Sequence, residues 1–334
     1  MKKIDLEKLI LFDNIRGDAL AAKAAALFAA LYDDASGLSA GEEPVRLYYE
    51  TQRGLLAARA DANADGRFTY WRRHVLRLVA EGENAFSLSA ERGEADPGLC
   101  ALAAAEMPVL KALYESDWNR AAAVFGGGGP CVADMMPPGC AGEGDAPLAL
   151  DRILRMRDAA EAASALAAYY AREACGGFGR YTAFSFSRDC GLVGAERPDP
   201  VRFEDLIGYA PQKERIIENT EFFLDGRPYG NMLLYGDRGT GKSSSVKALA
   251  NRFKSRGLRL VALPKAEIDA LPALMDALAP RGCKFIVFID DLSFEENETG
   301  YKAFKSALEG GVHAQPANTL VCVTSNRRNI VKEI

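Results

Sequence analysis

The stretch Gly236-Asp237-Arg238-Gly239-Thr240-Gly241-Lys242-Ser243 determines how the rest of the sequence is interpreted. It fits the pattern GxxxxGK(S/T), in which glycines let backbone N–H groups converge on an anion and the following helix adds the positive end of its dipole. An apolar run, 232–235, precedes the match, and a helical pattern begins near Lys242. We therefore predict a phosphate-binding loop in which Lys242 reaches the β- and γ-phosphates of a nucleotide and Ser243 binds Mg²⁺.

Apolar runs alternate with helical patterns on both sides of this loop. Strands are expected over 232–235, 258–263, 285–289 and 319–324, and helices over 242–253, 266–278 and 301–308. Buried apolar strands that alternate with helices indicate a parallel sheet covered on both faces. Residues 201–334 are therefore predicted to form a three-layer α/β/α domain.

Two acidic residues, Asp290 and Asp291, directly follow the most apolar of these runs. A carboxylate at the carboxyl end of a buried parallel strand, beside a phosphate-binding loop, completes the coordination of Mg²⁺ in enzymes built this way. We expect Asp290 to bind Mg²⁺ and Asp291 to orient or deprotonate the attacking water. A helix-capping carboxylate is the alternative for Asp291.

A third polar cluster, 324–328, ends the last predicted strand. The neutral amide of Asn326 can hold a water between the metal-binding carboxylates and the γ-phosphate. The alternative is a turn that merely ends the strand, since Ser and Asn favour turns.

The order of these motifs resembles the AAA+ ATPases, with Asn326 at their sensor 1 position. Leu206-Ile-Gly-Tyr209 is similar to the AAA+ segment that contacts adenine. The strings LIGY, NTEFFLDG, LLYGDRGTGKSS, DDLSFEENETGYKAFKSALEGG and TSNRRN resemble, over about residues 199–331, a bacterial family of predicted ATPases known as domain of unknown function 815. The resemblance implies ATP and Mg²⁺ as cofactors, and conversion of ATP and water to ADP and phosphate.

The resemblance and the motifs together give a set of expected site residues. The nucleotide contacts are Ile207, Gly208, Gly236, Asp237, Arg238, Gly239, Thr240, Gly241, Lys242, Ser243 and Ser244. The catalytic residues are Lys242, Asp291 and Asn326, and the Mg²⁺ ligands are Ser243 and Asp290.

Two features depart from the AAA+ pattern. Many AAA+ proteins have Asp-Glu where this chain has Asp290-Asp291. The side chain of Asp291 is shorter than that of Glu, so we expect it to hold the attacking water less well. Glu295 and Glu296 are close in sequence and could substitute for it. The chain also ends before a fifth strand, an arginine finger and a helical lid, and 327–328, two arginines, lie too close to Asn326 to replace the finger. We therefore expect a chain truncated after sensor 1. Without the fifth strand, 232–235 would lie at an open edge of the sheet. Without the arginine finger, which contributes about 10³ to 10⁵ in rate, we expect ATP hydrolysis to be impaired.

Residues 1–175 are predicted to form an α-helical domain, followed by a linker, 176–200, with a short strand over 180–187. Apolar residues recur at helical spacing over 20–31, 70–80, 110–125 and 150–173, and Pro108 suits the first turn of the third stretch. The glycine- and proline-rich segment 126–147 is expected to be a long loop. The basic cluster Arg72, Arg73, His74 and Arg77 is interpreted as a solvated helix face.

Charge and composition narrow the classes of partner. Of the 41 Lys and Arg and 46 Asp and Glu, residues 201–334 hold 19 and 17, which leaves a net charge of −7 on residues 1–200. The acidic helical domain points to a protein partner rather than to nucleic acid. The seven cysteines form no CxxC pair and the histidines number two, so zinc has few ligands and a reducing cytoplasm is the expected compartment. Neither a signal peptide nor an apolar stretch of membrane-spanning length is present, so no membrane is expected.

The leading functional hypothesis is an ATPase whose nucleotide state drives remodelling of a partner captured by the helical domain. A nucleotide-gated adaptor with little hydrolysis is the alternative from a different class. A small-molecule kinase lacks a second substrate site, a GTPase lacks NKxD and a transporter ATPase lacks an LSGGQ-like signature. The resemblance also implies homo-oligomers for a full-length protein.

Overall fold

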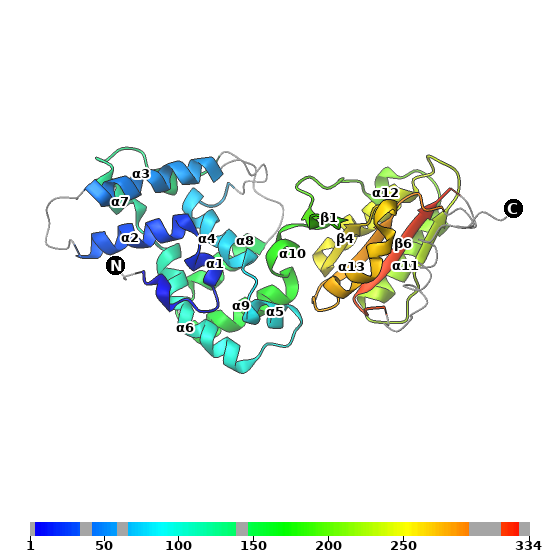
Figure 1. The fold of residues 1–334 in the computed structure, drawn as a ribbon, viewed down its shortest axis with the longest axis horizontal. Helices are drawn as coiled ribbons and strands as arrows, with labels where there is room; N and C mark the ends of the chain where they lie inside the picture. The colour runs from blue at the N-terminus through cyan, green and yellow to red at the C-terminus, as the bar shows by residue number, and fades with distance from the viewer. Residues whose placement is uncertain (1–3, 34–41, 59–65, 138–145, 294–314, 327–334) are drawn as a thin grey trace. The chain divides into compact units, whose positions relative to one another are not determined.

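The computed structural model describes residues 4–33, 42–58, 66–137, 146–293 and 315–326, which form two compact units, 1–171 and 172–334 (Figure 1). The predicted helix over 301–308, the acids Glu295 and Glu296 and the arginines at 327–328 lie outside the described residues.

The first unit is helical, as predicted. Its elements are η1 (Leu6–Lys8), α1 (Asp13–Arg16), α2 (Ala19–Asp33), α3 (Glu42–Ala57), α4 (Tyr70–Glu81), α5 (Ala85–Glu91), α6 (Pro97–Tyr114), α7 (Trp118–Phe125), η3 (Val132–Asp134), α8 (Ala146–Arg155) and α9 (Ala159–Glu173), the last of which runs past residue 171. Trp118 of α7 packs edge-on against Phe28 of α2 and Trp71 of α4, with ring centroids 5.1 and 5.0 Å apart. These buried aromatic rings supply much of the apolar area that holds the helices together.

Two stretches that were expected to be single helices are each divided in two. The stretch 110–125 covers the end of α6 and all of α7, and 150–173 covers most of α8 and all of α9. In both cases an aspartate starts the second helix: Asp117 accepts a hydrogen bond from a first-turn N–H of α7, and Asp158 does the same for α9. The apolar spacing continues across each break, but the capping aspartate starts a new helix there.

The α6 helix begins earlier than expected. It starts at Pro97, behind Asp96, whose side chain accepts a hydrogen bond from the N–H of Leu99 at 2.8 Å. Pro108 therefore lies inside the helix and not in its first turn, so the predicted helix start at Pro108 is wrong.

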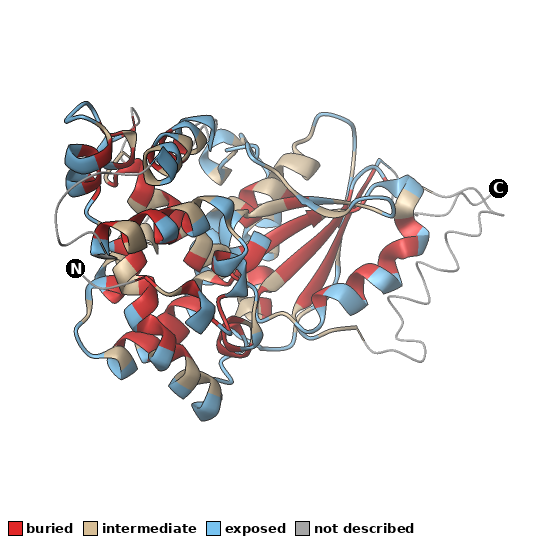
Figure 2. Ribbon diagram, turned by 60° about the vertical axis from the view of Figure 1, so that its left-hand side comes forward, coloured by how far each residue is buried: buried red, intermediate tan, exposed pale blue. Residues whose placement is uncertain are grey.

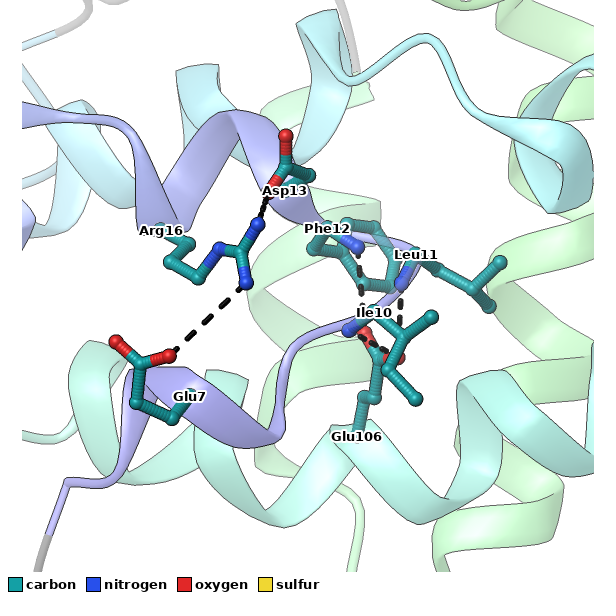
Figure 3. Close-up of polar contacts among 7 residues, drawn as sticks. All are labelled: Glu7, Ile10, Leu11, Phe12, Asp13, Arg16 and Glu106. Carbon is teal, nitrogen blue, oxygen red and sulfur yellow. Dashed lines mark hydrogen bonds and ion pairs between the residues drawn. The ribbon is translucent and has the colours of Figure 1, made fainter.

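A buried carboxylate fixes the amino-terminal segment to α6 (Figure 3). Glu106 is 1% exposed, and its two oxygens accept hydrogen bonds from the backbone N–H groups of Ile10, Leu11 and Phe12 at 2.8, 2.9 and 3.2 Å. These three N–H groups precede α1, where they have no partner in a helix or sheet. The side chain thus satisfies donors that would otherwise be buried without a partner.

The basic cluster on α4 is not a uniformly solvated face. His74 is buried, with its Nε2 2.9 Å from Asp18 Oδ1, and the guanidinium of Arg72 lies over the ring of Tyr114. The solvated-face interpretation is therefore wrong for His74, because the buried face of α4 is wide enough to include it.

The second unit contains a six-stranded sheet and is of the predicted α/β class. Its elements are α10 (Gly176–Arg180), β1 (Ala183–Ser187), β2 (Gly191–Gly194), η4 (Phe203–Asp205), α11 (Ala210–Leu224), β3 (Met232–Tyr235), α12 (Lys242–Phe253), η5 (Lys254–Arg256), β4 (Leu258–Ala262), η6 (Lys265–Ala270), α13 (Leu271–Leu278), β5 (Lys284–Ile289) and β6 (Thr319–Ser325). The strand order is β2-β1-β4-β5-β6-β3, and all neighbours are parallel except β1 and β2. Among the described residues β3 is an edge strand, as expected, with Leu233 and Tyr235 exposed.

Helices cover both faces of this sheet, and its central strands are buried (Figure 2). Along β5 successive side chains point to opposite faces. Ile286 and Phe288 pack with α11 and α12, whereas Phe285, Val287 and Ile289 pack with η6, α13 and Phe178 of α10. The predicted three-layer arrangement is therefore confirmed.

Residues 176–200 contribute to the sheet rather than only linking two domains. The hairpin of β1 and β2 extends the sheet beyond β4, and Phe184 of β1 is buried in the core. A buried arginine of β4 holds the same segment: Arg259 is 4% exposed and donates to the carbonyl oxygens of Phe178 (2.7 Å) and Glu173 (3.0 Å). The sequence predicted the short strand over 180–187 but neither β2 nor the pairing with β4, because a local pattern does not specify pairing partners.

Candidate functional site

The glycine-rich loop (236–243) connects β3 to α12, as the sequence predicts. Gly236, Gly239 and Gly241 have φ values of 145°, 78° and 81°, a region that side chains with a Cβ rarely adopt. No atom lies within 4 Å of a Cβ placed on Gly239, so the backbone there is open to a ligand. Because α12 begins directly at Lys242, its first-turn N–H groups face the same loop.

The ammonium of Lys242 lies inside the curl of this loop. Its Nζ donates to the carbonyl oxygens of Gly236 at 2.8 Å and Asp237 at 2.7 Å. It also lies 3.2 Å from Oδ1 of Asn326, at the end of β6. The loop and the predicted sensor position are thus in direct contact.

Polar side chains from three segments of the chain come together beside the loop. The Ser243 hydroxyl donates to Asp290 Oδ1 at 2.6 Å, and the Thr324 hydroxyl donates to the same oxygen at 2.5 Å. The Asn326 amide donates to Asp291 Oδ1 at 2.6 Å. The carboxylate of Asp290 therefore lies against the start of α12, and that of Asp291 against the end of β6.

The strand pairing explains why these groups meet. In the parallel pair β5–β6, Ile289 lies opposite Val323, which brings Asp290 and Thr324 together just beyond. The backbone of Asp291 then turns into the left-handed region, with φ 48°, and its N–H donates to the Thr324 hydroxyl at 2.9 Å. Aspartate tolerates this conformation better than most residues, and the turn directs its carboxylate away from that of Asp290. Whether Asp291 also caps a helix depends on residues beyond those described.

The segment 199–209 lies along α12 and reaches the loop. Asn251 donates to the carbonyl oxygens of Asp199 and Val201, both at 2.8 Å, and Lys247 pairs with the Asp199 carboxylate at 3.0 Å. A Cβ on Gly241 would lie 3.8 Å from a methyl carbon of Leu206. The predicted adenine-contacting segment is therefore beside the glycine-rich loop.

The two predicted base contacts in this segment are both exposed. Ile207 is 96% exposed, and Gly208 has a φ of 78°. The carbonyl oxygen of Leu206 accepts a hydrogen bond from Lys213, which ties the segment to the first turns of α11.

The other predicted loop residues do not enter the carboxylate cluster. Asp237 and Arg238 are exposed, and Ser244 is half-buried in the first turn of α12. The Thr240 hydroxyl donates to the carbonyl oxygen of Asp237 at 2.9 Å, which braces the loop from within.

Thr324 is the residue whose individual role the sequence did not reveal. It is 1% exposed and its hydroxyl touches groups of both aspartates. The available signal was its place as the first polar residue after the apolar part of the last strand. Its partners follow from the register of β5 on β6, which no local pattern specifies.

A comparison with known families matches the segment that contains this site. Residues 179–334 match the model of a family described as Protein of unknown function (DUF815). An ATP-dependent zinc metalloprotease FtsH of Aquifex aeolicus (strain VF5) is 34% identical over 87 residues, which are 24% of this chain and 14% of that protein. AAA-ATPase At5g57480 of Arabidopsis thaliana is 30% identical over 112 residues, 31% of this chain and 21% of that protein.

The similarity thus spans about a fifth or less of either relative. Among the described residues, the helices are all too short or too polar to cross a bilayer. The resemblance predicted from the motif order is confirmed: residues 179–334 match the DUF815 family model, and part of the chain is similar to AAA-type ATPases.

Proposed function

We propose that the chain binds ATP with Mg²⁺ at the glycine-rich loop, hydrolyses it, and uses the change of nucleotide state to remodel a protein partner held by the helical unit. The observation that carries the proposal is the convergence of 236–243, 290–291 and 324–326 within hydrogen-bond distance. Contacts that only stabilise the fold would not need this combination of a lysine, a serine, two aspartates and an amide at an open glycine-rich loop.

The residues present fit a bound nucleotide. The three left-handed glycines keep side chains away from the loop backbone, and a cation with a flexible stem, Lys242, is already inside it. In the proposed complex Lys242 exchanges its carbonyl partners for phosphate oxygens. The exposed side chain of Ile207 supplies an apolar surface for the base, and the Gly208 backbone allows a close approach.

The residues also fit a magnesium ion. Ser243 Oγ and Asp290 Oδ1 lie 2.6 Å apart, so one cation can contact both, and Mg²⁺ prefers one or two carboxylates together with substrate phosphates. When bound, Mg²⁺ neutralises negative charge on the phosphate oxygens. Asp291 then accepts a proton from water or orients it, and Asn326 holds the Asp291 carboxylate in place.

A nucleotide-gated adaptor is the second candidate, and one observation favours it. The Asp291 side chain is one methylene shorter than Glu, and its Oδ1 already accepts a hydrogen bond from Asn326. A carboxylate held in this way reaches a water less readily, which would allow binding without turnover.

The test compares Lys242→Ala with a matched variant, Lys254→Ala. Lys254 is exposed, follows the other end of α12, and its loss changes the net charge equally. We expect a fluorescent ATP analogue to bind the wild type and Lys254→Ala and to bind Lys242→Ala at least about tenfold more weakly. Equal binding by all three proteins, or by none, would overturn the proposal.

Phosphate release and light scattering then separate the two candidates. Mg²⁺-dependent turnover that Asp291→Asn abolishes supports the ATPase. Nucleotide-dependent assembly without turnover supports the adaptor.

A further inference from the structure

The helical unit contains a hollow lined by basic side chains, remote in sequence from the glycine-rich loop. It lies between the end of α3 and the first three turns of α4. Its lining residues are Leu55, Ala58, Tyr70, Arg73, His74 and Arg77. Its volume is about 50 Å³, several times the roughly 10–15 Å³ that one water needs, so it admits a group of a few heavy atoms but not a nucleotide. Ala58 is exposed, so the hollow reaches the surface.

One guanidinium in this hollow has an unused donor. The Nη1 atom of Arg73 is buried and has no hydrogen-bond partner among the described residues. The same guanidinium lies over the ring of Tyr70, 6.0 Å from its centroid, which limits how far it can swing away. Buried donors in folded proteins almost always have a partner, so the position of Nη1 indicates an acceptor that the described residues do not provide.

A second guanidinium lies on the same face of the helix. Arg73 and Arg77 are four residues apart on α4, a spacing that places side chains next to one another. An oxyanion between two guanidinium groups at this spacing can accept hydrogen bonds from both. Arg77 Nη2 is 3.3 Å from Nδ1 of His74, which holds its guanidinium at the wall of the hollow.

The neighbouring histidine lies between the hollow and Asp18. His74 Nδ1 faces Arg77 Nη2 at 3.3 Å. Nε2 lies 2.9 Å from Asp18 Oδ1, an oxygen that also accepts from the N–H groups of Leu20 and Ala21 at the start of α2. That carboxylate oxygen already has three donors and lies on the far side of the imidazole from Arg77.

We propose that this hollow binds a small oxyanion, a phosphate or carboxylate group of a small molecule, between the guanidinium groups of Arg73 and Arg77. Guanidinium groups recognise both kinds of oxyanion through paired N–H donors. The buried apolar walls, Leu55 and the Tyr70 ring, reduce the contact of a bound anion with water and strengthen the interaction. The site does not depend on the proposed ATPase function.

The experiment measures binding of inorganic phosphate and of acetate by calorimetry, at an ionic strength held constant with chloride. Every arm uses the full chain carrying Lys242→Ala, so that binding at the glycine-rich loop is weakened to the same extent in all of them. Arg73→Gln is compared with Arg72→Gln, a matched change on the neighbouring residue, which lies over the Tyr114 ring and does not line the hollow. Far-ultraviolet circular dichroism checks that both variants fold.

We expect phosphate, acetate or both to bind the Lys242→Ala protein, and Arg73→Gln to weaken that binding roughly tenfold to hundredfold while Arg72→Gln does not. The anion that binds more tightly identifies the natural ligand as a phosphate or a carboxylate compound. If Arg73→Gln does not fold, Arg73→Lys replaces it, because lysine keeps the charge but cannot donate in parallel, and it should weaken binding about tenfold. Absence of binding by both anions, or equal weakening by the Arg72 and Arg73 variants, would overturn the proposal.

Discussion

Replacing Thr324 with valine tests whether the carboxylate cluster depends on strand β6. Valine keeps the shape of the buried side chain and removes only the hydroxyl, which contacts Asp290 Oδ1 at 2.5 Å and the N–H of Asp291 at 2.9 Å. No other described side chain contacts groups of both aspartates through hydrogen bonds. Its loss frees Asp290 to turn and leaves the left-handed backbone of Asp291 without this support.

The expected magnitude follows from these two hydrogen bonds. A neutral hydrogen bond contributes about 1 kcal/mol to stability, and one to a charged group about 1.5–3 kcal/mol. Both aspartates are exposed, so water replaces part of each interaction. We expect Thr324→Val to lower the free energy of unfolding by about 1–3 kcal/mol. If a similar amount of transition-state stabilisation is lost, turnover falls about fivefold to 150-fold. The affinity for ATP should change much less, because Lys242 does not contact Thr324.

Thr319→Val is the matched control, since Thr319 is fully buried at the other end of the same strand. Its hydroxyl makes only a long hydrogen bond, 3.4 Å, to the Asn318 side chain. Urea unfolding and phosphate release are measured for both variants. Equal losses of turnover in the two would refute the reasoning, because the effect would then reflect β6 as a whole and not the hydroxyl at the site.

Two further predictions concern the helical unit. Glu106→Gln should lower the free energy of unfolding by about 1–3 kcal/mol, because a neutral amide replaces a carboxylate that accepts from three backbone N–H groups; an unchanged urea midpoint would contradict this. Burial raises the pKa of Asp18, but hydrogen bonds from His74 and from the N–H groups of Ala21 and Leu20 outweigh it and leave the pKa below its ordinary 3.8. The stability that Asp18 contributes is therefore present above that value and lost as the pH falls through the lower, folded-state pKa. Asp18→Asn should accordingly flatten the loss of the urea midpoint between about pH 5 and pH 3, and a slope like that of the wild type would exclude this role.

Elements with strong local signals were predicted almost to the residue. The strand 232–235 and the helix 242–253 coincide with β3 and α12, because an apolar run, left-handed glycines and a helix start follow one another within twenty residues. Helix breaks at Asp117 and Asp158 were missed, since the apolar spacing on both sides of each break is the same. A capping aspartate is also a local signal, because it marks the start of a new helix even where the apolar spacing continues.

The residues of the candidate site could be predicted from the sequence, but the contacts among them could not. Lys242, Ser243, Asp290, Asp291 and Asn326 each follow from a motif, and the structure brings all five within one network. Which group contacts which depends on the pairing of strands that are far apart in sequence, β5 with β6 and β3 with β6. That information is not contained in any one motif.

Arg259 shows that a sequence can indicate a long-range contact without identifying the residues that make it. The run 258–263 predicts a buried strand, yet it contains an arginine, whose burial is costly unless every donor is satisfied. An alternating pattern would place this side chain in solvent, but it is buried, and it donates to the carbonyl oxygens of Glu173 and Phe178. Carbonyl groups at helix ends have no intrahelical partner, so the end of α9 and the short helix α10 are suitable acceptors. In this chain the arginine inside an otherwise apolar strand therefore marks the place where helix ends pack on that strand, beside the strands 183–187 and 191–194 that extend the sheet.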